Sequence, residues 1–382
     1  MKFDIVVFGA TGYTGRLVAE HLAMRHASGE QFTFALAGRS LEALEAAREA
    51  AGAPPDTPLL LADAARPATL HTLVANTRSV ITTVGPYQLY GSELVAACVA
   101  SGTDYLDLCG EPGWMRQMIQ THHESAVATG ARILFACGFD SVPSEIGVWL
   151  CQRTARDVLG APVPRIKGRV RRFHGALSGG TAATIRATMS AIESAPSLGR
   201  LLTDPFALTP GFQGPPQPTA TEHEDDSDVG PTEPFMLGAI NRMSVHRSNL
   251  LQGHAYGTDF VYDEMALVGA ISSPVEGVPF AAGEGPTRQQ RDEGSFDLLF
   301  IGKAADGRQV RVSVSSDKDP GYGSTAQIIG ETALCLLHAP DVPGGMWTPV
   351  AALQDRLLRQ LRQHTALVFR CRAALDDISV QR

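Results

Sequence analysis

The segment GATGYTG, residues 9–15, constrains the fold of this chain more than any other feature. It directly follows the apolar run 4–8 and opens a helical pattern over 16–23. Glycines there permit a tight turn and let backbone N–H groups at the start of the helix approach a pyrophosphate. Between a strand and a helix, this spacing predicts a dinucleotide-binding loop rather than a glycine turn without a ligand. The residues expected to contact the cofactor are Gly9, Thr11, Gly12, Tyr13, Thr14 and Gly15.

Short apolar runs alternate with helical patterns up to about residue 150. The expected strands cover 4–8, 32–37, 59–62, 80–84, 105–108 and 132–136, and the expected helices cover 16–23, 41–51, 93–101 and 114–129. Alternation of this kind is typical of a parallel sheet with helices on both faces. We therefore predict an α/β fold in which residues 1–150 form a Rossmann-type, doubly wound cofactor domain.

The end of the second expected strand indicates which dinucleotide is bound. An NAD site places Asp or Glu there, where the carboxylate accepts a hydrogen bond from the ribose 2′-OH. This chain instead has Arg39 and Ser40, and no acidic residue before Glu42. A guanidinium pairs well with a 2′-phosphate, and the serine hydroxyl adds a hydrogen bond. The pattern favours NADPH over NADH, unless Arg39 is only a solvated residue before a helix.

Ligands of open α/β sheets bind beyond the carboxyl ends of the strands, where further candidates occur. Asp63 follows the third strand, and either meets the adenine or caps a turn. Gly85 and Pro86 follow the fourth strand and are expected near the nicotinamide ribose. Asp107 and Glu111, around the fifth strand, either act in the site or bond neighbouring loop amides.

Beyond residue 150 the pattern predicts a mixed α+β substrate domain over 151–320. Strands are expected at 165–173, 296–301 and 310–314, a hairpin turn at Asp306-Gly307, and a long helix at 181–202. Two loop insertions, near 203–234 and 273–294, are rich in Pro, Gly or charge, and are either linkers or lids over a ligand cleft. Patterns at 325–338 and 349–367 predict a C-terminal helical segment over 321–382.

Charge and composition exclude several classes of protein. The chain has 32 Lys plus Arg against 40 Asp plus Glu, a net charge of −8, whereas a nucleic-acid reader needs clustered positive charge. The six cysteines include no Cys-x-x-Cys pair, which favours buried thiols over a zinc site or disulfides, and no metal is expected. With no secretory signal or bilayer-length apolar stretch, the expected location is the cytoplasm, with at most peripheral contact with the inner face of the plasma membrane.

Several co-linear segments carry a resemblance to a known family. GATGYTG (9–15), VGPYQLYG (84–91), GTDYLDLCGEPGW (102–114) and CGFDSVPSEIG (137–147) together resemble the saccharopine dehydrogenase-like oxidoreductases, in particular the branch with the bacterial trans-acting enoyl reductases. LSGGTAAT (177–184), DPGYGSTA (319–326) and GGMWTPVAAL (344–353) are similar to that branch as well. The resemblance implies an NADP-binding Rossmann domain and a mixed substrate domain. It also implies reduction of a carbon–carbon double bond in a lipid or polyketide precursor, within glycolipid synthesis.

The second half offers binding candidates of its own. Asp140 and Ser141 either face the cofactor cleft or cap the following helix. Gly179-Gly180-Thr181 opens the long helix and offers N–H groups to an anion or a carbonyl oxygen, or is merely a tight turn. Four cations alternate along one strand, so they share a face that either binds a phosphopantetheine arm, an acidic carrier domain or a carboxylated substrate, or is simply solvated. They are Arg165, Lys167, Arg169 and Arg171.

An enoyl reductase needs a proton donor for the α carbon, and Tyr322, His174 or water are the candidates. The leading hypothesis is an NADPH-dependent reductase of a free or carrier-bound acyl or lipid substrate. The first alternative is a saccharopine-type amino-acid dehydrogenase, which needs cationic residues to hold several substrate carboxylates. The second is a sensor that binds NADPH without turnover.

Overall fold

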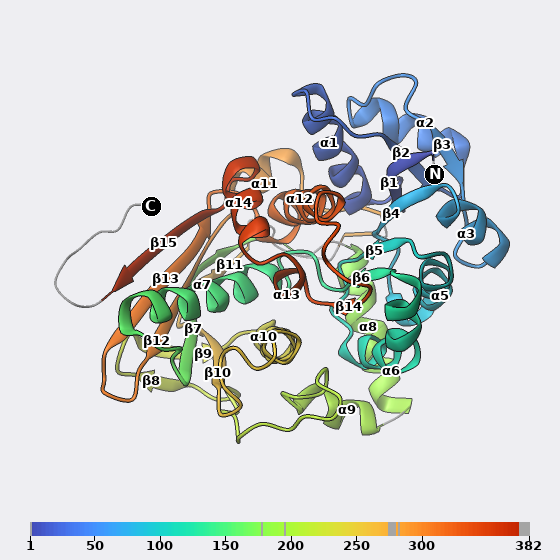
Figure 1. The fold of residues 1–382 in the computed structure, drawn as a ribbon. Coiled ribbons are helices and arrows are strands. Elements are labelled where there is room, and N and C mark those ends of the chain that lie inside the picture. Colours follow the sequence, from blue (N-terminus) through green and yellow to red (C-terminus); the bar gives the residue numbers. More distant parts are fainter. Residues whose placement is uncertain (1, 177–178, 195, 274–279, 282, 374–382) are drawn as a thin grey trace.

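The computed structural model describes residues 2–176, 179–194, 196–273, 280, 281 and 283–373. These residues form two sheets that lie beside one another, with helices packed around and between them (Figure 1). The N-terminal third of the chain builds most of the first sheet, and the later residues build the second. This arrangement is the α/β fold with a second, mixed sheet that the sequence predicts.

The first sheet is parallel throughout, in the order β14-β6-β5-β4-β1-β2-β3. Its strands are β1 (Phe3–Phe8), β2 (Phe34–Gly38), β3 (Leu59–Leu61), β4 (Thr77–Thr82), β5 (Asp104–Leu106), β6 (Arg132–Leu134) and β14 (Gly345–Trp347). The strand order reverses between β1 and β4, which are direct neighbours. In open α/β sheets the ligand crevice lies at such a switch point, outside the carboxyl ends of the strands.

Helices cover both faces of this sheet, because its strands are apolar on both faces. The helices around it are α1 (Tyr13–Ala27), α2 (Leu41–Ala50), α3 (Pro67–Val74), α4 (Tyr87–Tyr90), α5 (Ser92–Ser101), α6 (Pro112–Thr129) and α12 (Thr325–Leu337). Val7 belongs to a core cluster with Leu22 of α1 and Ile328 of α12 on one face of the sheet. The preceding residue, Val6, points to the other face and belongs to a cluster with Leu94 of α5 and Met118 of α6. The predicted doubly wound arrangement is confirmed.

The second sheet is mixed, in the order β15-β13-β12-β7-β10-β9-β8, with β11 paired to β7. Its strands are β7 (Arg165–His174), β8 (Glu224–Asp226), β9 (Gly230–Pro234), β10 (Val261–Leu267), β11 (Ile271–Ser272), β12 (Ser295–Lys303), β13 (Gln309–Ser316) and β15 (Val368–Ala373). Helix α7 (Val142–Leu159) packs on one face, where Gly147 leaves room for the ring of Phe300. The β12–β13 hairpin turns at Gly307, which has φ +89°, as the Asp-Gly signal predicts.

The remaining helices all follow β7 in the chain. They are α8 (Gly179–Ser194), α9 (Pro196–Thr203), α10 (Gly238–Leu251), α11 (Arg288–Glu293), α13 (Pro349–Leu353), α14 (Asp355–His364) and a π-helical turn, η1 (Pro320–Ser324). Among the described residues, no helix has both the length and the apolar character needed to cross a bilayer.

Four sequence predictions differ from the structure. The long helix expected over 181–202 is two helices, α8 (Gly179–Ser194) and α9 (Pro196–Thr203), on either side of residue 195, which lies outside the described residues. The insertion near 203–234 is not loop throughout, because its acidic run ends in β8 and its last residues form β9 of the second sheet. The expected helix at 349–367 is two helices, divided at Gln354, whose φ of +45° a continuous helix cannot contain. Residues 321–373 are also not only helical, since β14 completes the first sheet and β15 the second.

Candidate functional site

The glycine loop connects β1 to α1 at the switch point of the first sheet. Gly9 has φ +89°, and a Cβ atom on it would lie 2.8 Å from Thr83 Oγ1. A Cβ atom on Gly15 would lie 2.1 Å from the Gly9 carbonyl oxygen, so only glycine lets the helix pack this closely on the loop. These contacts give physical reasons for two of the three glycines.

The start of α1 is suited to an anion. Gly12 is the N-cap, no side chain caps the helix, and its first turn contains no acidic residue. The first backbone N–H groups of a helix have no intrahelical acceptor, and the helix dipole favours negative charge beside them. The residues present therefore fit the pyrophosphate of a dinucleotide, which Thr11, Tyr13 and Thr14 would surround.

Residues at the end of β2 lie beside this loop. A Cβ atom on Gly38 would lie 3.5 Å from the methyl group of Thr11, so the next residue, Arg39, starts from the edge of the predicted cofactor site. Arg39 is exposed, and it makes no ion pair among the described residues. Ser40 is the N-cap of α2, where its Oγ accepts from Ala43 N at 3.2 Å. The hydroxyl proton of Ser40 is not used in that bond and stays available to a phosphate oxygen.

The other strand-end candidates divide into two groups. Asp63 accepts from Ala65 N at 3.0 Å, which is the turn-capping alternative. The carboxylate of Glu111 accepts from Tyr87 N and Gln88 N at 2.7 and 2.9 Å, so it caps α4 just after the Gly85-Pro86 loop. That loop faces α8, because a Cβ atom on Gly85 would lie 3.8 Å from Thr184 Oγ1.

Asp107 is fully buried and holds the ends of β5 and β6 together. It accepts from Ala136 N at 2.8 Å and Cys109 N at 3.0 Å, and Tyr105 donates to its other oxygen at 2.9 Å. Burial raises the pKa of Asp107 to about 7 despite these donors. Asp107 and Glu111 therefore both bond loop amides, as one of the two sequence interpretations has it.

Of the two side chains considered as proton donors, Tyr322 is the one that lies against the glycine loop. Its ring meets the ring of Tyr13 edge to face at 5.1 Å, and its hydroxyl lies 2.9 Å from Thr181 Oγ1 at the start of α8. Because Tyr13 belongs to the loop after β1 and α8 passes the loop after β4, Tyr322 stands above the switch point. The other candidate, His174, lies at the end of β7 and bonds Ser272 Oγ at 2.8 Å through Nδ1.

Asp319 sets the position of Tyr322, and sequence reasoning missed it. Its carboxylate accepts from the backbone N–H groups of Gly321, Tyr322 and Gly323, at 3.3, 2.6 and 2.9 Å. Burial raises the pKa of Asp319, while these three bonds act in the opposite direction. An Asp directly before Pro-Gly is a recognised turn signal, which is the clue that the sequence did contain.

Residues 283–293, here called the strap, lie against the glycine loop. Tyr13 Oη donates to Pro286 O at 2.5 Å and accepts from Arg291 at 3.0 Å, and Arg16 donates to Gly283 O at 3.1 Å. The N–H of Gly179 donates to Glu284 O at 3.2 Å, so the strap uses one of the amides predicted to meet an anion. Because these contacts hold residues 283–293 against the glycine loop, this part of the insertion near 273–294 fits a lid better than a linker. Residues 274–279 and 282 lie outside the described residues.

Ser141 differs from its helix-capping interpretation. It occupies the N-cap position of α7, but its side chain makes no capping bond and instead lies 3.1 Å from Ser244 Oγ. Asp140 is half-buried at the end of the β6 connection, and burial raises its pKa to about 6. Neither residue touches Tyr322 among the contacts of the described residues.

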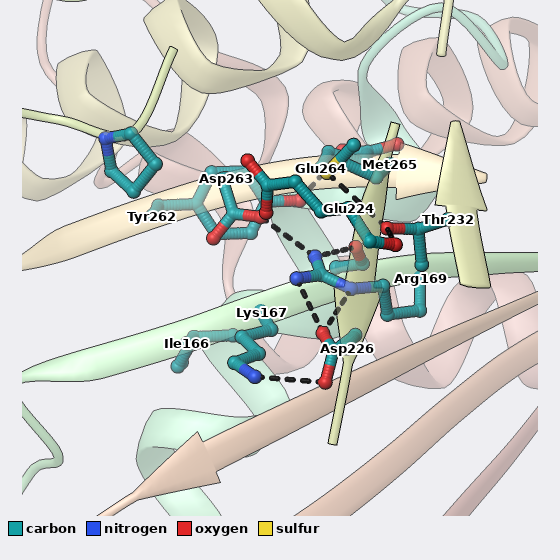
Figure 2. A network of polar contacts seen from close by, with 12 residues as sticks. Ile166, Lys167, Arg169, Glu224, Asp226, Thr232, Tyr262, Asp263, Glu264 and Met265 are labelled. Atoms are coloured by element: carbon teal, nitrogen blue, oxygen red, sulfur yellow. Dashed lines mark hydrogen bonds and ion pairs between the residues drawn. The ribbon is translucent and has the colours of Figure 1, made fainter. Parts of the chain in front are cut away.

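The basic strand, for which the sequence left both ligand binding and solvation open, is largely neutralised by the chain itself. Arg169 lies between two carboxylates, with Nε 2.8 Å from Asp226 and Nη1 2.7 Å from Asp263 (Figure 2). Lys167 donates to Asp226 at 2.9 Å and to Asp228 at 2.8 Å. The two remaining cations are also paired, Arg165 with Asp263 and Arg171 with Asp297. The acidic run near 222–226, which looks like a solvated loop in the sequence, supplies part of this network.

Comparisons with known proteins agree with this geometry. Residues 5–134 match the family described as the saccharopine dehydrogenase NADP binding domain. The matched range includes the glycine loop and Arg39. A putative trans-acting enoyl reductase of Mycobacterium tuberculosis is 36% identical over 402 residues, which cover 94% of this chain and 95% of that protein. A trans-acting enoyl reductase of Mycobacterium ulcerans is 36% identical over 414 residues, covering 96% of this chain and 97% of that protein.

Similarity of fold extends to a solved structure. Apo saccharopine dehydrogenase (L-Glu forming) from Saccharomyces cerevisiae superposes with a TM-score of 0.56 at 11% identity, covering 98% of this chain and all of that one. The NADP-binding domain identifies NADPH as the cofactor, and the chain is an NADP-dependent oxidoreductase. It belongs to the saccharopine dehydrogenase-like oxidoreductases and, within them, to the trans-acting enoyl reductases.

Proposed function

We propose that this protein reduces the carbon–carbon double bond of an α,β-unsaturated acyl group in a lipid or polyketide precursor, with Tyr322 as the proton donor. The observation that carries the proposal is the position of Tyr322, in contact with Tyr13 of the glycine loop and with Thr181 of α8. When bound, NADPH supplies a hydride. The α carbon of the substrate then needs a proton, and a phenol over the crevice is suited to donate it.

The other residues of the site have supporting parts in this proposal. The N–H groups at the start of α1, together with Gly9, Gly12 and Gly15, hold the pyrophosphate, and Arg39 with Ser40 holds the 2′-phosphate. Asp319 fixes the turn that carries Tyr322, through its three bonds to backbone N–H groups. The strap covers Tyr13 and thereby limits the access of water to this end of the crevice.

The names of the relatives support an acyl substrate, and "trans-acting" fits a reductase that receives its substrate from a separate protein. We therefore include carrier-bound acyl groups, on the route to a glycolipid, in the proposal. A lipid product would also bring the protein to the inner face of the plasma membrane as a peripheral protein.

The saccharopine-type dehydrogenase is the second candidate, and it is favoured by the likeness to the yeast enzyme. Its substrate has several carboxylates, which require cationic partners near the nicotinamide. The cations of β7 are already paired with Asp226, Asp228, Asp263 and Asp297. Because these cations are therefore not free to bind substrate carboxylates, the ion pairs count against this candidate.

The proposal is tested by following NADPH absorbance with purified protein and a panel of substrates. The panel contains crotonyl and longer 2-enoyl thioesters, the corresponding saturated thioesters as controls, and 2-aminoadipate semialdehyde with glutamate for the second candidate. Oxidation of NADPH by the enoyl thioesters alone is the expected result. Turnover only with the amino-acid pair would replace the proposal by the second candidate, and binding of NADPH with no turnover would favour the sensor.

A further inference from the structure

The face of the second sheet that points away from α7 has an unusual concentration of arginine. Along β13 and β15, Val312 and Cys371 point toward α7, so their neighbours in the chain point to the opposite, outer face. The pairing of these strands sets Arg311 opposite Arg372 and Ser313 opposite Arg370. Arg171 of β7 lies on the same face, beyond Leu299 of β12. We call Arg171, Arg311, Arg370 and Arg372 the arginine patch.

The patch surrounds a surface hollow of about 270 Å³. Arg171 is paired with Asp297 at 2.9 Å, and Arg311 donates to Gln309 at 3.3 Å. Arg311, Arg370 and Arg372 have no ion-pair partner among the described residues, and the last two are exposed. Three guanidinium groups that lie in one hollow without ion-pair partners repel one another. The chain has a net charge of −8, yet none of the described carboxylates pairs with them.

On the adjoining part of the same face, the basic side chains already have acidic partners from the chain itself. There, Asp226 and Asp228 of the β8–β9 hairpin reach across the sheet to Lys167, Arg169 and Lys303, with separations of 2.7 to 2.9 Å. The ligand at that half of the face is thus an acidic peptide segment of the chain itself. The arginine patch continues this basic surface over β13 and β15, but with no such segment on it in the described chain.

We propose that the arginine patch is the docking surface for an acidic carrier protein that presents the unsaturated acyl group to the crevice. The inference rests on the proposed function for the identity of the partner. Guanidinium groups pair with carboxylates in a bidentate geometry, and exposed charges of one sign accelerate encounter with a partner of the other sign.

The place of the patch in the fold fits this use. Ser313 at its centre and Asp319, which holds the Tyr322 turn, are six positions apart in the chain, so their Cα atoms lie at most about 22 Å apart. A carrier seated on the patch therefore lies on β13, the strand that is followed by the Tyr322 turn. A flexible prosthetic arm has this short distance to span.

The test compares one acyl group in two forms, crotonyl thioester on an isolated acidic acyl carrier protein and crotonyl-N-acetylcysteamine, which is uncharged. In the variant Arg370→Glu/Arg372→Glu, we expect KM for the carrier-bound form to rise about tenfold or more. Both kinetic constants for the small thioester should stay within about twofold of wild type. Raised salt should increase KM of the wild type for the carrier form only, because salt screens exposed charges. The matched control is Lys2→Glu/Arg359→Glu, which changes the net charge equally at exposed sites elsewhere.

Direct binding of the same carrier, measured by interferometry, separates the two proposals. If the wild type binds the carrier but reduces no enoyl thioester, the proposed function fails while the docking surface stands. Equal carrier affinity in the wild type and in the double variant overturns the docking proposal. So does retention of the protein on anionic vesicles through these arginines with no carrier binding, which assigns the patch to a membrane.

Two further variants guard the result. Arg370→Gln/Arg372→Gln removes the charge without reversing it, and should give a smaller KM rise in the same direction should the Glu variant misfold. Deletion of residues 374–382 tests whether the C-terminal residues, which include Asp376 and Asp377, occupy the patch. A gain in carrier affinity on deletion supports a shared surface, and carrier affinity that depends wholly on those residues contradicts the proposal.

Discussion

The ring of Tyr13 meets the ring of Tyr322 edge to face, with 5.1 Å between the ring centroids. Tyr13 begins the first helix after the glycine loop, whereas Tyr322 follows the last strand of the β12–β13 hairpin. The edge of one aromatic ring is positive and the face of another is negative, so this geometry is attractive. The contact positions the ring of Tyr322 relative to the glycine loop.

Replacement of Tyr322 by Phe removes the hydroxyl and retains the ring contact. We expect kcat with an enoyl thioester to fall by about 100-fold, the usual size of a general-acid contribution, with little change in NADPH affinity. Stopped-flow measurement of NADPH oxidation checks this. Tyr13→Phe is the comparison, because it loses the bonds to Pro286 and Arg291 but leaves the donor in place. A wild-type kcat in Tyr322→Phe would exclude Tyr322 as the donor.

The charge of Arg39 should decide between the two nicotinamide cofactors. In Arg39→Glu, a carboxylate repels the 2′-phosphate and accepts a hydrogen bond from a ribose 2′-OH. We expect the Kd for NADPH to rise by roughly 10- to 100-fold, about 1.4 to 2.8 kcal/mol, while the Kd for NADH falls or stays constant. Fluorescence titration of both cofactors measures the shift. A loss of equal size for NADH and NADPH would point to a damaged loop instead.

A single methyl group at Gly15 should disrupt the cofactor loop. The new Cβ atom would lie 2.1 Å from the Gly9 carbonyl oxygen, which cannot move without displacing β1. We expect Gly15→Ala to abolish measurable NADPH binding in calorimetry. The matched control is Gly199→Ala in α9, whose Cβ atom would meet Ile192 at an ordinary 3.5 Å. That control should bind NADPH normally and gain up to about 1 kcal/mol in helix stability.

The buried ion pairs of β7 should matter far more to stability than the exposed ones. Arg169 is 2% exposed, so Asp226→Asn leaves a buried cation with half of its partners and costs about 3 kcal/mol in the free energy of unfolding. The control, Asp317→Asn, removes the partner of Arg172 at a side chain that is 98% exposed, and should cost less than about 0.5 kcal/mol. Urea denaturation measures both. Equal effects would mean that the network is solvated in solution.

The pH dependence of stability should depend on Glu145 in α7. Burial raises the pKa of Glu145 to about 8, against 4.5 for an exposed glutamate, although it accepts hydrogen bonds from Ser248 and Val350 N. Between pH 4.5 and 8 the folded state therefore holds a proton that the unfolded state has released. Stability falls as the pH rises through this window, since the unfolded state binds fewer protons. Glu145→Gln should flatten this loss in thermal melts from pH 5 to 8, whereas an unchanged slope would assign it to other groups.

Local patterns were enough to predict six of the seven strands of the first sheet, all but β14, and the glycine loop between β1 and α1. The alternation of apolar runs and helices determines a parallel sheet, and the glycines of residues 9–15 have local steric reasons that sequence can express. Asp63 and Ser40 were also placed correctly at the ends of their strands, but their capping bonds depend on the turns that follow.

What sequence did not predict involves partners far away in the chain. The acidic run that ends at Asp226 looks like a solvated loop, because its partners Lys167 and Arg169 lie almost 60 residues earlier. Residues 368–373 were expected within a helical C-terminal segment, whereas they form β15, which pairs with β13 more than 50 residues earlier in the chain. The contact of Tyr13 with Tyr322 and the strap is likewise invisible to any local pattern.

The strand β14 has a consequence for biosynthesis. Residues 345–347 pair with β6, so the first sheet of a nascent chain keeps an open edge at Ile133 and Leu134 until β14, more than 200 residues later, has been synthesised. An unpaired, apolar strand edge is a template for association with other chains. The cofactor half is thus synthesised first but completed only when β14 emerges, and a nascent chain arrested before β14 should depend on chaperones more than one that contains it.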